Sequence, residues 1–137
     1  MKKFQKNSQP LIQKYFLHLE DYQISCININ KGSEDPPVFS IEIVGDILEN
    51  LICIDLEDFV RMNRFFKNAL NDTAKIPEYF LRLKDCIIKV KKTYRNFSPV
   101  FVVKINSVLM KNSACFDLKD FIKINRFFKQ ILDKIKQ

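Results

Sequence analysis

Basic and apolar side chains alternate in the segment IIKVKKTYR. In an extended chain Lys89, Lys91 and Arg95 lie on one side and Ile88 and Val90 on the other, because successive side chains of a strand point to opposite faces. A row of cations attracts the phosphates of a nucleic-acid backbone. The segment therefore predicts a strand with its apolar side in a core and its basic side in solvent.

Other basic and aromatic residues belong with this strand. Arg82, Lys84 and Lys104 alternate in the same way with apolar neighbours, so they are expected on the same open side of a sheet. Tyr94 and Phe97 end the segment, and an aromatic ring that stacks on an unpaired base contributes about 1–3 kcal/mol. A basic sheet with aromatic platforms suits a single strand better than a duplex. The alternative is that these lysines only keep an exposed strand soluble.

These residues belong to the second of two copies of one sequence unit. DLEDFVRMNRFFKNAL at 55–70 returns as DLKDFIKINRFFKQIL at 117–132, and YFLHLED at 15–21 returns as YFLRLKD at 79–85. The offset falls from 64 residues (15 to 79) to 62 (55 to 117), which places the length change in a loop. The expected organisation is a single domain, 1–137, made of repeat 1 at 12–72 and repeat 2 at 79–137.

Each repeat changes from a period of two residues to a helical period, which predicts four strands and one helix. Asp55 and Asp117 stand where helix N-caps are wanted, and Asp58 and Asp120 favour the positive end of the helix dipole. The expected strands are 15–21, 22–30, 38–44 and 50–54, then 79–85, 86–95, 100–106 and 112–116. The expected helices are 56–71 and 118–135.

The predicted fold class is α+β. Each helix carries an apolar stripe, expected at Phe59, Asn63, Phe66 and Leu70 and at the equivalent positions of the second copy. Phe65 and Phe127 add apolar surface beyond that stripe, so one repeat alone would leave its helix poorly covered. We expect two ββββα repeats to form an intramolecular pseudo-dimer, with antiparallel sheets and the helices packed at the centre.

The cysteines and the apolar segments bear on metal binding, disulfides and cellular location. The four cysteines stand alone in apolar stretches without a CxxC pair, so we expect strand residues in preference to zinc ligands or disulfides. No apolar run reaches the roughly 20 residues of a membrane span, and the start lacks the apolar core of a secretory signal. The expected location is intracellular, in the cytoplasm, nucleoid or nucleus.

No catalytic motif is present in the sequence. The chain has no nucleophile elbow or phosphate loop, and His18 is its single histidine, expected on an exposed strand. The paired aspartates are explained by helix capping. We therefore expect a protein that is not an enzyme and that needs no metal or cofactor.

In element order and spacing, residues 12–135 resemble the PUR-repeat proteins and, more distantly, the Whirly and positive-coactivator single-stranded-DNA-binding folds. ININKGS at 27–33 is similar to the end of the second PUR strand and its turn, where Lys, Asn and Gly are usual. KKTYRNF at 91–97 holds the same place in repeat 2 and lacks the Gly. The resemblance implies binding of single-stranded DNA or RNA, and it adds repeat 1 residues to the candidate site: Asn28, Asn30 and Lys31.

Charge separates the two repeats. Residues 15–72 hold four Lys or Arg against eleven Asp or Glu, whereas residues 79–137 hold fourteen against four. A phosphate backbone is therefore expected on repeat 2. The centre of the predicted site is Lys89, Lys91, Tyr94, Arg95 and Lys104, flanked by Arg82, Lys84 and Phe97.

Two alternatives stay open. Repeat 1 has a neutral or acidic, partly apolar face, which suits a protein-interaction adaptor, the cover of a strand edge or contact with another copy of the chain, and ordinary solvent-exposed surface is an equal alternative. A basic N-terminal arm with Lys2, Lys3 and Lys6 is a different source of affinity for nucleic acid.

Overall fold

The computed structural model describes residues 11–31, 36–46, 49–72, 78–107 and 111–135. Two antiparallel sheets of four strands follow one another along the chain, each with its strands in sequence order and each followed by a helix. The first unit is β1 (Leu11–His18), β2 (Gln23–Lys31), β3 (Val38–Val44), β4 (Glu49–Asp55) and α2 (Leu56–Asn71). The second is β5 (Glu78–Arg82), β6 (Cys86–Arg95), β7 (Ser98–Ser107), β8 (Lys111–Asp117) and α3 (Leu118–Ile135). The predicted α+β class and ββββα order are confirmed.

Both helices have the predicted bounds, because an N-cap sets where each begins. The Asp55 carboxylate accepts a hydrogen bond from the Asp58 amide at 2.8 Å, and Asp117 accepts one from the Asp120 amide at 2.8 Å. None of the helices in the described ranges combines the length and the apolar content needed to cross a bilayer.

The first strand of each unit ends three residues earlier than predicted. The Leu19 amide donates to the Tyr22 carbonyl at 2.8 Å, and the Leu83 amide donates to the Cys86 carbonyl at 2.9 Å. These bonds close two equivalent turns, at 19–22 and 83–86, so the residues expected to finish a strand instead reverse the chain. The period-two pattern of a strand does not show at which residue the chain must turn to pair with the next strand.

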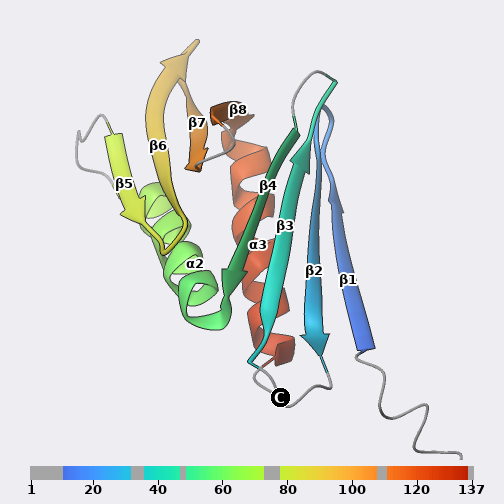
Figure 1. Ribbon diagram of the computed structural model, residues 1–137. Helices are drawn as coiled ribbons and strands as arrows, with labels where there is room; N and C mark the ends of the chain where they lie inside the picture. Colours follow the sequence, from blue (N-terminus) through green and yellow to red (C-terminus); the bar gives the residue numbers. More distant parts are fainter. Residues whose placement is uncertain (1–10, 32–35, 47–48, 73–77, 108–110, 136–137) are drawn as a thin grey trace, which may run out of the picture.

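The helices lie in the middle of the molecule, with β1–β4 on one side and β5–β8 on the other (Figure 1). Aromatic rings link the two sheets through both helices, with centroid distances of 4.1 to 5.8 Å. In order from β3 to β7, this row of rings is Phe39, Phe59, Phe128, Phe66, Phe121 and Phe101. The core is therefore continuous from one sheet to the other.

The buried stripe of each helix is not quite the predicted one. Met62 and Ile124 are buried where Asn63 and Asn125 were expected, and both asparagines are only half-buried. A spacing of three residues returns to the same helix face as well as a spacing of four, and the structure buries the apolar member of each pair. Asn125 instead donates its Nδ2 to the Phe121 carbonyl at 3.0 Å.

In each unit, the turn after the first strand also contacts the other unit. In the turn after β5, the Lys84 amide donates to Asp58 Oδ2 at 3.1 Å, and Lys84 Nζ pairs with Asp55. In the turn after β1, the Tyr22 ring packs on Phe116 at 5.0 Å, and the Tyr22 hydroxyl accepts a hydrogen bond from a β8 amide. The two turns thus reach the strand-to-helix junctions of opposite units.

The two junctions differ in charge. A hydrogen bond from Lys84 is the main reason that the pKa of Asp55 is lowered. At the other junction, Glu20 holds the place of Lys84, and the pKa of Asp120 is raised, first by burial and then by Asp117 and Glu20. Ionised Asp55 therefore stabilises the fold above the acid range, whereas ionised Asp120 destabilises it near neutral pH.

Replacing Glu20 with Lys should create the missing ion pair. We expect Glu20→Lys to raise the thermal midpoint at pH 7 by about 1–3 °C, as partly exposed pairs contribute little. The gain should shrink as the pH falls through the pKa of Asp120, because protonation removes the like-charge repulsion in the wild-type protein. Thermal unfolding at pH 7 and pH 4 measures both effects. Lys84→Glu is the matched reverse change and should lower the midpoint at pH 7; a gain from both variants would contradict the assignment.

Candidate nucleic-acid interface

The outer face of the β5–β8 sheet carries five of the six cations predicted in repeat 2. On β6, Ile88 and Val90 are buried against the helices, so Lys89 and Lys91 point away from them. In the register of the sheet, Lys89 lies between Phe80 on β5 and Lys104 on β7. Arg82 and Arg95 alternate to the same side. We call this surface the basic sheet face: Phe80, Arg82, Lys89, Lys91, Arg95 and Lys104.

Phe80 is a member of this face that the sequence prediction missed. Its side chain is 62% exposed, and the Lys89 ammonium lies 5.1 Å from the centre of its ring. Lys89 also pairs with Glu78 at 3.5 Å, so the ammonium is held beside the ring. The signal was present, since Phe80 is two residues from Arg82 on the same strand and must share its side.

The hairpin between β6 and β7 ends in an unusual turn. Asn96 and Phe97 have φ values of 52° and 68°, a left-handed geometry that normally uses Gly at the second position. A phenylalanine there is strained, and its side chain is completely exposed. The repeat 2 turn therefore keeps the tight geometry without the Gly and presents an aromatic ring at its tip.

Tyr94 does not lie on the basic sheet face. β6 runs without a bulge, so Tyr94 alternates to the helix side together with Lys92. Lys92 confirms this side, since its ammonium lies 5.4 Å from the Phe101 ring centre and donates to the Asp72 carbonyl. The prediction that grouped Tyr94 with Lys89 and Lys91 was wrong because it did not apply the alternation to Tyr94.

Two further predicted residues are displaced from the site. Lys84 lies in the turn beyond β5, where its ammonium pairs with Asp55 instead of facing the open sheet. Asn28 is buried on the inner side of β2, and its Oδ1 has no hydrogen-bond partner within the described residues. The side chains of Asn30 and Lys31 lie outside the part of the chain that the structure describes, as do Lys2, Lys3 and Lys6.

The cysteines and the histidine occupy strands as predicted. His18 is the exposed last residue of β1, and the four thiols are free. Burial raises the pKa of the Cys26 thiol to about 12, so it stays protonated at neutral pH. Within the described ranges no three His, Cys, Asp or Glu residues gather as metal ligands would.

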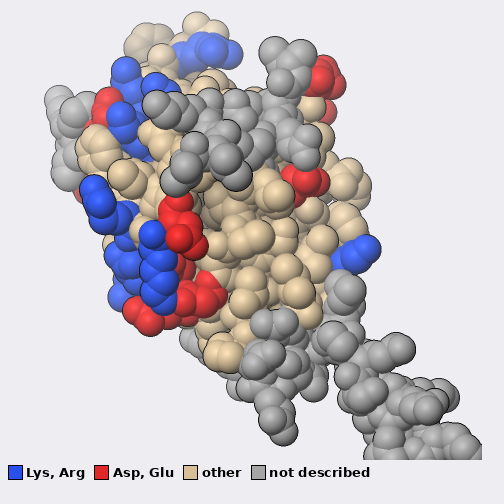
Figure 2. Space-filling model, in the orientation of Figure 1, with Lys and Arg blue, Asp and Glu red and all other residues tan. Residues whose placement is uncertain are grey.

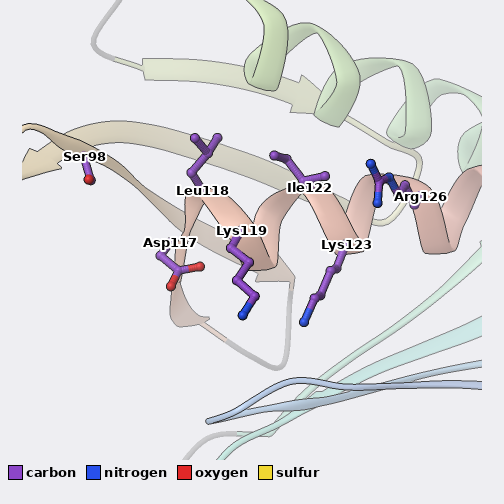
Figure 3. Close-up of a pocket in the computed structure, with 7 residues that line it drawn as sticks. All are labelled: Ser98, Asp117, Leu118, Lys119, Ile122, Lys123 and Arg126. Carbon is purple, nitrogen blue, oxygen red and sulfur yellow. The ribbon is translucent and has the colours of Figure 1, made fainter.

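A second basic surface lies on the helix side of the β5–β8 sheet. An open cavity of about 670 Å³ at the start of α3 is lined by three cations, Lys119, Lys123 and Arg126, together with Ser98, Asp117, Leu118 and Ile122. Lys119 and Lys123 extend to one side of the helix, and the two apolar side chains extend to the other (Figure 3). Positive charge in repeat 2 is thus divided between an open sheet and a helix.

Comparison with known proteins assigns no family to the chain. No model of a known protein family matches the chain, and no curated protein matches it. The choice between the two basic surfaces therefore depends on what each offers a ligand. The sheet adds an exposed aromatic ring to its cations, whereas the lining of the helix cavity has none.

Proposed function

We propose that this protein binds single-stranded DNA or RNA on the basic sheet face. The supporting observation is the placement of Phe80 beside Lys89, within a field of five cations on an open, solvent-facing sheet. Ammonium and guanidinium groups bind phosphates without reading sequence, and an exposed ring stacks on any base. This combination needs unpaired bases, so it favours single strands over a duplex.

Each part of the face has a separate role in this proposal. The Cα atoms of Lys89 and Lys91 are about 6.6 Å apart along β6. Their ammonium groups bind phosphates of the nucleic-acid backbone. Lys104 extends the positive field to β7, and Arg95 extends it towards the hairpin tip. Phe97 at that tip offers a second ring for a base, beyond the end of the sheet.

We infer that the two repeats form a pseudo-twofold pair within the chain. The support is reciprocal contact, because the turn after β1 packs on β8 and the turn after β5 packs on the start of α2. Lys134 at the end of α3 also lies over the Tyr15 ring of β1, 5.4 Å from its centre. Such pairing matches what the PUR-repeat resemblance implies. Repeat 1 then completes the core beneath the sheet that binds the ligand.

Fluorescence anisotropy tests this function directly. Labelled single-stranded DNA, single-stranded RNA and duplex DNA are titrated with the wild-type protein and Phe80→Ala at 50 to 300 mM salt. We expect single strands to bind tighter than duplex, with affinity falling by about 0.7 log units per contacted phosphate for each tenfold rise in salt. Phe80→Ala should weaken binding about tenfold without changing that slope, because a neutral ring contributes by stacking.

Phe16→Ala is the matched control, since Phe16 holds the equivalent place on β1 and is also exposed. It should leave affinity unchanged. Weak binding that is indifferent to salt would overturn the proposed function. Full affinity in Phe80→Ala, together with its loss when residues 1–10 are deleted, would assign binding to the N-terminal lysines instead.

A further inference from the structure

The outer face of the β1–β4 sheet is apolar. Four of the eight exposed large hydrophobic side chains in the described part of the chain lie there: Phe16, Ile29, Val44 and Leu51. Half-buried Ile27 and Val38 are on the same side of the same strands. Figure 2 views this side, and it is largely free of Lys, Arg, Asp and Glu. We call these six residues the apolar sheet face.

The register of the sheet makes these side chains neighbours. Phe16 on β1, Ser25 on β2, Glu42 on β3 and Leu51 on β4 form one row across the sheet. The next row begins with Lys14 and continues with Ile27. Among the described side chains, charge on this face comes from Lys14 on β1, Glu42 on β3 and Asp55 at the end of β4, with His18 at the end of β1.

The fold itself does not require an apolar surface here. At four of the six positions the other sheet has a polar or charged residue: Lys91 replaces Ile27, Thr93 replaces Ile29, Asn106 replaces Val44 and Ser113 replaces Leu51. Phe16 and Val38 correspond to the apolar residues Phe80 and Val100. The same architecture thus accepts polar side chains at these four positions. Because contiguous exposed apolar side chains often mark contact surfaces, the difference points to a ligand or partner that covers β1–β4.

We propose that the apolar sheet face binds the same face of a second copy of this chain. Two sheets pack face to face about 10 Å apart when their apolar side chains interdigitate. Within the described residues this surface offers a nucleic acid a single lysine, Lys14, and the basic sheet face of another copy would bury five cations against two carboxylates, Glu42 and Asp55. The apolar sheet face of a second copy is itself apolar, so it is the surface of this chain that complements the first.

The few charges on the face also suit a twofold pair. An axis along β2, in the plane between the two sheets, places β1 of one copy over β3 of the other. Lys14 and His18 on β1 of one copy then lie over β3 of the second copy, which carries Glu42. The symmetry repeats this arrangement, so it occurs twice. Residues 79–137, with a net charge of +10, stay on the outer ends of such a dimer, where they repel each other least.

Sedimentation of the full chain tests the proposal without nucleic acid, so its outcome is independent of the proposed function. At 200 µM, about ten times the Kd of a weak dimer that dissociates near 20 µM, we expect an average mass that approaches twice 16.3 kDa. Phe16→Lys combined with Leu51→Lys should weaken association at least about 100-fold and give the monomer. Phe80→Lys is the matched control on the other sheet and should remain dimeric.

Thermal unfolding separates lost association from lost folding. The wild-type midpoint should rise with protein concentration, and that of the double variant should not. Ser40→Arg provides a second test, because it removes no apolar side chain and adds bulk and charge between Ile27 and Cys53. A wild-type monomer at 200 µM would overturn the proposal, as would a Phe80→Lys variant that dissociates as readily as the double variant.

Discussion

Replacing Lys89 and Lys91 with glutamate should weaken single-strand binding about 100-fold at 50 mM salt, whereas the same replacement of Lys119 and Lys123 should cost only a few fold. Both double variants change the net charge equally, so their difference reports the site. Two lost phosphate contacts lower the salt slope by about 1.4, which alone is about 70-fold at this salt concentration, and the new carboxylates repel the backbone.

Anisotropy titrations of both variants between 50 and 300 mM salt give the affinity and the slope together. The thermal midpoint of each variant is measured alongside, to show that the fold is intact. A larger loss from Lys119 and Lys123 would move the site to the cavity at the start of α3. Equal losses would mean that the ligand responds to the overall charge of repeat 2 and not to one face.

Truncating Phe66 to Ala should lower the free energy of unfolding by about 3–5 kcal/mol, the usual cost of removing a buried aromatic side chain. Phe66 on α2 lies 5.7 Å from Phe121 and 5.8 Å from Phe128, so it joins repeat 1 to the helix of repeat 2. The loss should therefore weaken both repeats at once, and unfolding should remain a single transition.

Chemical denaturation followed by circular dichroism measures the loss, and amide exchange shows where protection falls. We expect exchange to accelerate on β6 and β7 as well as on β2 and β3. Phe80→Ala removes an exposed ring of the same size and should change stability by less than about 0.5 kcal/mol. Two separate transitions, with only the first affected, would show that the repeats fold independently.

Much of the fold followed from local patterns. The N-cap aspartates and the change of period placed both helices correctly, since a capping bond and an amphipathic stripe involve residues close in the chain. Alternation along β6 also placed Lys89 and Lys91 on the open side. The same rule, applied to Phe80 and Tyr94, would have added the first to the site and removed the second.

Two residues of the predicted site lie away from it. Lys84 looks like a continuation of the basic row, yet its partner is Asp55, 29 residues earlier in the sequence. Asn28 lies near a turn that the family resemblance favoured, yet its strand turns it into the interior. The Lys84 contact depends on how one repeat folds back on the other, whereas the inward position of Asn28 follows the alternation of the buried Ile24 and Cys26 along β2.

The sequence by itself determined the two repeats, the two helices, the segregation of charge into repeat 2 and the side of β6 on which its lysines lie. These features depend on the order of residues along the chain and on the fixed periods of helix and strand. Only the tertiary structure decided which cations remain available, which ring stands beside Lys89, and that the outer face of β1–β4 gathers its apolar residues into one surface. Those properties arise where strands and repeats distant in sequence meet, because a side chain's neighbours across a sheet are set by register and packing and not by its own segment.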